Sequence, residues 1–386
     1  MTPDFASHWS LDPAVAYLNH GSFGACPLAV QELQTELRRE LEREPVDFLA
    51  RRLQGRLDGA REELAAFLGA EAADLAFVPN ATTGVNAVLR SLQFQPGDEL
   101  LTTSHVYPAC HRTLEYVAAR CGARVVVAEL PFPLASEDDL VAPILAAVTP
   151  RTRLALLDHV TSLTALVLPL ARLVRELDAR GVDTLVDGAH APGMVPLALS
   201  ELGAAYYTGN AHKWLCAPKG AAFLHARRDR QADLHPTVIS HGLAGGFHAE
   251  FDWTGTCDPS PWLCIPEALR CMGGLLPGGW PALMAANHDL ALRGRDAVLG
   301  VLGSRAPAPD AMIGSMASIP LPAADPGTPG SGMDTEALTG WFRDRGVETW
   351  LYPKPVPVLR VSAQVYNRIE QFEGLALLLK EALHGA

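Results

Sequence analysis

The residues best suited to chemistry in this sequence are an aspartate and a lysine that follow apolar, strand-like segments. Asp187 ends one such segment and begins the sequence Asp-Gly-Ala-His, and Lys213 lies in the sequence TGNAHKW after the next one. A lysine amine can condense with an aldehyde. A carboxylate can keep a pyridine nitrogen protonated, so that the ring accepts an electron pair. The two residues therefore fit pyridoxal phosphate (PLP), bound as a Schiff base to Lys213, and a reaction at the α-carbon of an amino acid.

A phosphate group would need a second set of residues. The sequence Asn80-Ala81-Thr82-Thr83-Gly84 follows an apolar segment and opens an amphipathic one. Backbone N–H groups and hydroxyls in the first turn of a helix bind anions, which makes Thr82 and Thr83 candidate phosphate ligands. Taken alone, the same motif is more typical of an ordinary helix N-cap by Thr82 or Thr83.

Two aromatic residues, His105 and Tyr107, follow the segment that ends at Thr103. Either ring could stack on a flat heterocycle, although a half-exposed loop residue would explain each of them as well. A polar run, Asp158 to Ser162, follows a later segment. The phosphate loop, the aromatic residues, this polar run, Asp187 and Lys213 thus occur in order, each after a strand-like segment.

The elements that must position these residues alternate along the chain. Such alternation predicts an α/β fold with a mostly parallel sheet, in which ligands bind at the carboxyl ends of the strands. The expected strands are Leu75–Val78, Glu99–Thr103, Arg124–Leu130, Leu154–Asp158, Thr184–Asp187, Ala204–Thr208 and Ala221–Leu224, and helices are expected at 82–91, 109–120, 138–148 and 169–180.

The two ends of the chain have other patterns. Residues 28–68 repeat leucine at helical spacing and predict one or two amphipathic helices, interrupted near Pro45. After Trp253 the composition changes, and a smaller α+β domain is expected. Its expected elements are helices at 265–275, 281–302, 334–345 and 367–384, a strand at 357–362 and a Pro/Gly-rich loop at 322–332. We therefore divide the chain into an N-terminal arm (1–15), a large domain (16–260) and a small domain (261–386).

Composition narrows the possible partners. The 386 residues carry a formal net charge of -12, which argues against sequence-independent binding to nucleic acid. No apolar run has membrane-spanning length, and the first residues do not resemble a secretory signal. The seven cysteines are odd in number and form no CxxC pair. Such a set indicates reduced thiols, so we expect a cytoplasmic protein.

Several longer motifs resemble one known family. The segments YLNHGSFGACP (17–27), HVYPA (105–109), DGAH (187–190) and NAHKW (210–214) are similar to class V aminotransferase-like PLP enzymes of fold type I, in their isopenicillin N epimerase-like branch. FDWTGTCDPSPWLCIPEAL (251–269), IGSMASIPLP (313–322) and LRVSAQVYN (359–367) extend the resemblance over nearly the whole chain. It implies a mostly parallel seven-stranded sheet with helices on both faces, and a smaller α+β domain.

The resemblance also implies roles for individual residues. Lys213 would bind the cofactor, Asp187 would pair with the pyridine nitrogen and His190 would lie on the side of the phenolic oxygen. Tyr107 would stack on the ring and act in catalysis, with His105 as the competitor for stacking. The implied phosphate ligands are Thr82, Thr83, Asn210, His212 and, in the neighbouring subunit of a homodimer with shared sites, Thr256; the implied substrate ligands are Arg360, Asn19 and His20.

One departure distinguishes branches of this family. Cysteine desulfurases use a cysteine nucleophile in the C-terminal part, whereas here no cysteine follows Cys271. An epimerase, racemase or C–S lyase needs no such thiol and begins with removal of the α-proton by the lysine. We therefore expect an epimerase or racemase, with β-elimination or transamination as alternatives within the family.

Two readings from other classes stay open on the sequence. A metal-dependent hydrolase could use Asp187, His190 and His212 as ligands, but this leaves Lys213, the phosphate loop and Arg360 without a role. A sensor that binds PLP without catalysis would not need the full set of lysine, aspartate and arginine. The motifs name neither the amino-acid substrate nor the reaction at its α-carbon.

Overall fold

A seven-stranded sheet forms the centre of the molecule. The computed structural model describes residues 5–322, 335–353 and 356–384. The strand order is β2-β8-β7-β6-β5-β3-β4; β8 runs antiparallel to both neighbours, and all other pairs are parallel. This confirms the predicted α/β fold. The strands are β2 (Leu75–Val78), β3 (Glu99–Thr103), β4 (Arg124–Ala128), β5 (Thr152–Asp158), β6 (Asp183–Asp187), β7 (Tyr206–Asn210) and β8 (Ala222–Ala226).

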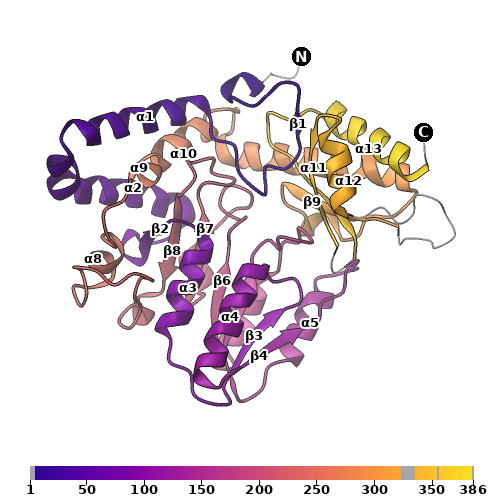
Figure 1. Cartoon of the computed structure of the whole chain (residues 1–386). Coiled ribbons are helices and arrows are strands. Elements are labelled where there is room, and N and C mark those ends of the chain that lie inside the picture. Colours follow the sequence, from indigo (N-terminus) through magenta and orange to yellow (C-terminus); the bar gives the residue numbers. More distant parts are fainter. Residues whose placement is uncertain (1–4, 323–334, 354–355, 385–386) are drawn as a thin grey trace.

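Helices cover both faces of this sheet (Figure 1). Side chains along a strand point alternately to opposite faces. Leu154 and Leu156 of β5 accordingly pack with α3 and α4, whereas Ala155 and Leu157 belong to the core beneath α5 and α6. Burial on both faces explains why the strands are continuously apolar in sequence. The covering helices are α3 (Ala81–Ser91), α4 (Pro108–Cys121), α5 (Asp138–Ala146), α6 (Leu170–Asp178) and the short α7 (Leu199–Leu202).

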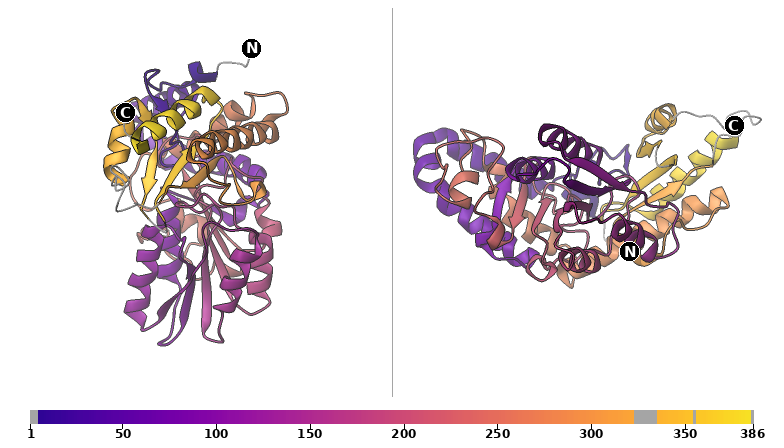
Figure 2. Two further views of the ribbon diagram at one scale, coloured as in Figure 1. Left: turned by 90° about the vertical axis from the view of Figure 1, so that its right-hand side faces the viewer. Right: turned by 90° about the horizontal axis from the view of Figure 1, so that it is seen from below.

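The C-terminal residues form a smaller α+β unit at one end of the sheet (Figures 1 and 2). Its antiparallel sheet has the order β11-β12-β9, and α11 packs on β9 and α13. The predicted loop at 322–332 and the start of the helix expected at 334 lie almost wholly outside the described residues. The elements are α11 (Gly279–Leu302), β9 (Met316–Pro320), α12 (Thr335–Arg343), β10 (Val347–Glu348), β11 (Trp350–Tyr352), β12 (Val358–Ser362) and α13 (Ile369–His384).

The N-terminal segment forms a separate two-stranded sheet with the C-terminal unit. Strand β1 (Ala16–Tyr17) pairs in parallel with β10, so the start of the predicted large domain lies against the small one. The domain limits 1–15, 16–260 and 261–386 stay a prediction. Helix α1 (Leu28–Arg43), a π-helical turn at Asp47–Arg52 and α2 (Leu53–Leu68) come next, and α8 (Phe247–Phe251), α9 (Ser260–Leu263) and α10 (Ile265–Gly273) complete this side.

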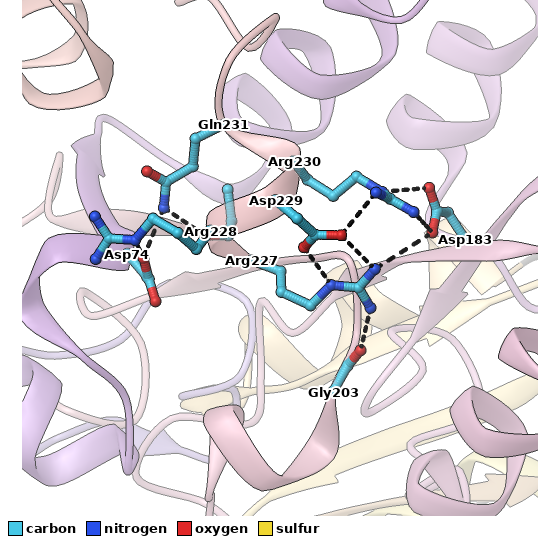
Figure 3. Close-up of polar contacts among 9 residues, drawn as sticks. Asp74, Asp183, Gly203, Arg227, Arg228, Asp229, Arg230 and Gln231 are labelled. Atoms are coloured by element: carbon cyan, nitrogen blue, oxygen red, sulfur yellow. Dashed lines mark hydrogen bonds and ion pairs between the residues drawn. The ribbon is translucent and has the colours of Figure 1, made fainter.

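The edge of the sheet where β6 begins is held by ion pairs (Figure 3). Arg230 contacts Asp183, the first residue of β6, at 2.8 Å, and Arg227 contacts Asp229 at 2.6 Å. Gln231 donates to Asp74 at 2.7 Å. Because β6 ends at Asp187, this polar cluster lies at the opposite end of the strand from the predicted chemistry. In the described part of the chain, no helix is both long and apolar enough to cross a membrane.

Candidate active site

The carboxyl ends of the central strands meet at one cavity. Asp158, Asp187 and Thr208 are register partners on β5, β6 and β7. Beyond these strand ends lies a cavity of about 230 Å³. Seven of the predicted site residues line it, from four separate regions of the chain: Thr82, Tyr107, Asp187, His190, Asn210, His212 and Lys213.

Lys213 lies just beyond the end of β7, with its amine in the cavity. Its Nζ atom lies 3.1 Å from Nε2 of His190. Removal of the amine from water, together with the nearby charge of Arg360, lowers the pKa of Lys213 to about 7. A large fraction of the amine is therefore neutral near pH 7, which is the form that attacks a carbonyl.

His190 is held in one tautomer. The indole N–H of Trp214 donates to its Nδ1 atom at 3.4 Å, so Nδ1 must be an acceptor. Burial, then the charge of Lys213, lowers the pKa of His190 well below its ordinary value, and the ring stays neutral. The proton therefore resides on Nε2, which can donate to the amine of Lys213 when that amine is neutral. The same N–H is suited to an oxygen of a ligand in the cavity.

Asp187 is buried at the end of β6, with both carboxylate oxygens engaged. Oδ1 accepts from the backbone N–H of Ala189 at 3.0 Å, and Oδ2 accepts from the thiol of Cys110 at 3.1 Å. Burial raises the pKa of Asp187, whereas these two hydrogen bonds and the charge of Lys213 favour the anion. The carboxylate is thus fixed in direction, as a partner of a ring nitrogen must be.

The N-terminus of α3 opens onto the cavity. Asn80 caps the helix by accepting from the backbone N–H of Thr83 at 2.8 Å, and Asn210 accepts from that of Ala81 at 2.8 Å. The hydroxyl of Thr83 also donates to Asn80, so Thr83 does not line the cavity. Thr82 does line it, and no hydrogen bond among the described residues uses its backbone N–H. One free N–H and one hydroxyl at a helix N-terminus suit a phosphate.

The two aromatic candidates lie in different places. Tyr107 lines the cavity and is 41% exposed, at the first turn of α4. His105 is fully buried outside the cavity lining, where its Nδ1 lies 3.0 Å from Oγ1 of Thr164. Burial lowers the pKa of His105 to about 4. The geometry therefore favours Tyr107 as the stacking residue, which stays a prediction.

Arg360, on β12, does not line the cavity itself but contacts two residues that do. Its guanidinium donates to the hydroxyl of Ser22 at 2.6 Å and to the carbonyl oxygen of Ser162 at 2.7 Å, and both serines line the cavity. Asn19 accepts from it at 3.4 Å. In the described ranges no carboxylate pairs with this buried arginine, and its Nε has no partner. A buried cation without an anion is what a substrate carboxylate would complete.

The N-terminal segment packs closely on the lysine loop. A Cβ atom on Gly24 would lie 2.5 Å from the carbonyl oxygen of Lys213, so only glycine allows this approach. His20 lies beneath the same loop, with Nδ1 2.8 Å from the Tyr366 hydroxyl and Nε2 3.0 Å from the Lys213 carbonyl oxygen. His20 therefore supports the lysine loop and does not line the cavity. This position gives no support to the predicted role of His20 in substrate binding.

One predicted site residue, Thr256, lies outside the lining of the cavity, and several residues that were not predicted line it. Thr256 lies on an exposed loop and does not line this cavity, so its predicted role in a neighbouring subunit stays a prediction. Residues outside the predicted set also line the cavity: Ser22, Phe23, Asn80, Asp158 and Ser162. Their positions next to predicted motifs were the available signal, since Ser22 and Phe23 lie in the N-terminal motif and Asp158 and Ser162 bound the polar run.

The residues of the cavity fit pyridoxal phosphate better than a metal. Within the described residues, no group of three His, Cys, Asp or Glu side chains could hold a metal ion. Nδ1 of His212 already lies 2.9 Å from the Ala221 carbonyl oxygen, and both nitrogens of His190 are engaged. The metal-dependent hydrolase therefore gains no support. Fold and site together define a PLP-dependent enzyme: a reactive lysine, a directed carboxylate and a helix N-terminus around one cavity.

Comparison with known proteins gives the family. Residues 26–256 match the aminotransferase class-V model, and the chain belongs to this family of PLP-dependent enzymes. It is 38% identical to isopenicillin N epimerase of Amycolatopsis lactamdurans, over 96% of both chains. It is 29% identical to an L-cysteine desulfhydrase of Arabidopsis thaliana, over 96% of this chain and 88% of that protein. The solved structure of the cystine C–S lyase C-DES shares the fold, with a TM-score of 0.80 at 22% identity, over 95% and 97% of the two chains.

Proposed function

We propose that this enzyme inverts the configuration of an amino acid at its α-carbon, as an epimerase or racemase. The observation that carries the proposal is that Lys213 and Tyr107 line one cavity beside Arg360, whereas none of the cysteines lines it. Inversion needs one group that removes the α-proton and a second that returns a proton, but it needs no thiol. The identity of 38% to isopenicillin N epimerase supports the same reaction.

The chain's own groups would each perform a separate part of the reaction. When bound, pyridoxal phosphate supplies an aldehyde for the amine and a ring that takes up an electron pair. Arg360 would bind the substrate carboxylate through two N–H groups and so orient the α-carbon. The amine of Lys213, with its pKa lowered to about 7, would take the α-proton. The phenol of Tyr107 would return a proton on the other side.

The phosphate would lie at the N-terminus of α3. Thr82, Asn210 and His212 line the cavity there and are the candidate ligands, with Thr83 acting through the cap. Asp187 would pair with the ring nitrogen, and the Nε2 proton of His190 would reach the phenolic oxygen. Asn19 would hold the guanidinium of Arg360 in place.

Two broader features belong to the same proposal. The active unit would be a homodimer in which Thr256 of one subunit completes the phosphate site of the other. The described cysteines are all free thiols, which supports a reducing compartment such as the cytoplasm.

A C–S lyase is the second candidate, because an L-cysteine desulfhydrase is 29% identical over 96% of the chain. Both reactions begin with removal of the α-proton, and they differ in the next step. β-Elimination expels a sulfur group from Cβ and needs no proton donor on the far side of the α-carbon.

Incubation with candidate amino acids in deuterium oxide tests the proposal. We expect the protein to be yellow, to retain its cofactor on Lys213 after borohydride reduction, and to invert at least one amino acid with deuterium uptake. Lys213→Ala, as the control, should lose both the fixed cofactor and the exchange. Release of pyruvate and ammonia without inversion would favour the lyase, and a colourless protein that binds zinc would refute the PLP enzyme.

A further inference from the structure

A second carboxyl group, Asp158, lies beside Asp187 in the same cavity. The two residues are register partners at the ends of the parallel strands β5 and β6. Neighbouring strands are about 4.8 Å apart, and register partners point to the same face. Asp158 and Asp187 are 2% and 3% exposed, and both line the cavity.

The contacts of the two carboxyl groups differ. Asp187 accepts hydrogen bonds on both oxygens, from Ala189 and Cys110. Among the residues that the structure describes, the backbone N–H of Tyr107 donates to Oδ1 of Asp158 at 3.3 Å, and the buried Oδ2 of Asp158 has no partner. An anionic carboxylate can only accept hydrogen bonds, so burying an oxygen without a donor costs free energy in the ionised form of Asp158. The cost is much smaller if Oδ2 carries a proton, because the group is then neutral.

The surrounding charges favour the same division. The positive charge of Lys213 lowers the pKa of Asp187 and so favours its anion. Burial and then the neighbouring Asp187 raise the pKa of Asp158 well above its ordinary value, and the amide of Tyr107 opposes this only in part. Two adjacent carboxylates in a site of low polarity do not both ionise.

We propose that Asp158 is a positioning residue of the cofactor site: it stays protonated beside an ionised Asp187 and fixes the backbone of Tyr107. The pair then carries one negative charge, which matches the single positive charge of a protonated pyridine ring. Through its hydrogen bond with the Tyr107 amide, Asp158 also holds Tyr107 at the end of β5, next to Asp187 on β6. This inference rests on the PLP site proposed above.

Infrared difference spectroscopy tests the protonation state without the cofactor. At neutral pH, wild type minus Asp158→Asn should show the C=O band of a buried carboxylic acid, in a protein freed of PLP. If the difference shows only carboxylate bands, Asp158 is ionised and the inference is wrong. Because this readout needs no cofactor, a protein that fails to bind PLP would refute the proposed function and not this inference.

Two variants in the PLP-loaded protein separate charge from positioning. Asp158→Asn keeps a neutral side chain with one acceptor and one donor. The pH midpoint of the absorption change of the lysine-bound cofactor should therefore move by less than about 0.3 unit. Asp158→Leu is also neutral but strands the Tyr107 amide, and it should weaken cofactor binding by about 5- to 100-fold, a loss that Asn rescues. A midpoint shift of about one unit or more in Asp158→Asn would mean that a charge was removed, so that Asp158 is ionised in the wild type. Equal cofactor binding by the wild type, Asp158→Asn and Asp158→Leu would contradict the positioning role.

Discussion

Two side chains that can carry a proton line the cavity, Lys213 and Tyr107. Their acid–base properties differ because of their surroundings. Lys213 is shielded from water beside His190 and Arg360, and its pKa falls to about 7. Burial raises the pKa of Tyr107, which keeps the phenol protonated at neutral pH. A lysine that can take a proton and a phenol that can give one are the combination that inversion requires.

The phenol is the basis of our prediction at the residue scale. Tyr107→Phe should keep the cofactor, because the ring remains. It should slow inversion by about 10- to 100-fold and exchange of the α-proton by no more than about 3-fold, since exchange needs only Lys213. Both rates come from one incubation in deuterium oxide. Tyr116→Phe, which alters an exposed tyrosine on α4, is the matched control and should change neither rate.

A similar loss of exchange and inversion, with PLP still bound, would contradict the role of Tyr107. His105, or Lys213 acting on both faces, would then be the remaining donors. A modest effect on turnover with pyruvate as the product would instead agree with the lyase.

At the scale of elements, the site depends on β12 meeting the N-terminal segment. β1 pairs with β10, and the backbone N–H of Ser362 on β12 donates to the Leu18 carbonyl oxygen at 2.8 Å. This arrangement places Arg360 against Ser22 and Ser162. The proposed binding of the substrate carboxylate would therefore depend on two chain segments that are more than 300 residues apart in sequence.

Arg360→Lys tests this element. Lysine keeps the charge but loses the planar fork that can donate two parallel hydrogen bonds. We expect KM to rise by about 10- to 100-fold, with a smaller change in kcat and an unchanged spectrum of the bound cofactor. Steady-state kinetics with the identified substrate measure both constants.

Arg61→Lys is the matched control, because Arg61 is equally buried but pairs with Asp252 at 2.6 Å outside the cavity. It should lower the melting temperature and leave KM unchanged. An unchanged KM in Arg360→Lys would exclude Arg360 as the carboxylate ligand.

For the molecule as a whole, Thr256 is a predicted phosphate ligand that does not line the cavity of its own subunit. It is exposed, and it lies on the loop between α8 and α9, apart from the cavity lining. Exposed apolar side chains also gather before α8, at Val238, Ile239 and Leu243, each 55% exposed. An exposed apolar patch of this kind suits a subunit interface.

Mixed dimers test whether the sites are shared. Thr256→Val should weaken PLP binding by about 10- to 100-fold, through the loss of a hydrogen bond to a charged group. Co-expression of Thr256→Val with Lys213→Ala should restore one intact site per mixed dimer, with Lys213 from one chain and Thr256 from the other. Sedimentation should give a dimer. A stable monomer with full activity, or mixed dimers without recovery, would exclude the shared site.

Patterns in the sequence predicted the fold class and most of the candidate site residues. Continuous apolar strands between amphipathic helices predicted a sheet buried on both faces, and the seven strands of that sheet lie within about two residues of their predicted bounds. The strands β1, β9, β10 and β11 were not predicted. The largest shift is in β7, expected at Ala204–Thr208 and observed at Tyr206–Asn210. Composition predicts only where an apolar run lies, whereas the start and end of β7 depend on its hydrogen bonds with β8. Residues directly after strands, such as Asp187 and Lys213, could be found because parallel strands bring their carboxyl ends together.

How those residues are arranged around the cavity depends on the folded structure. His20 and Tyr107 both lie in recognisable motifs, yet one supports the lysine loop and the other lines the cavity. Asp158 begins a predicted polar run, but its proximity to Asp187 depends on the register of β5 and β6. The contact of Arg360 with Ser22 depends on the packing of distant segments. Local sequence fixes residue type and strand periodicity, whereas register and long-range packing fix which side chains face one another, and pKa values and hydrogen-bond partners depend on that arrangement.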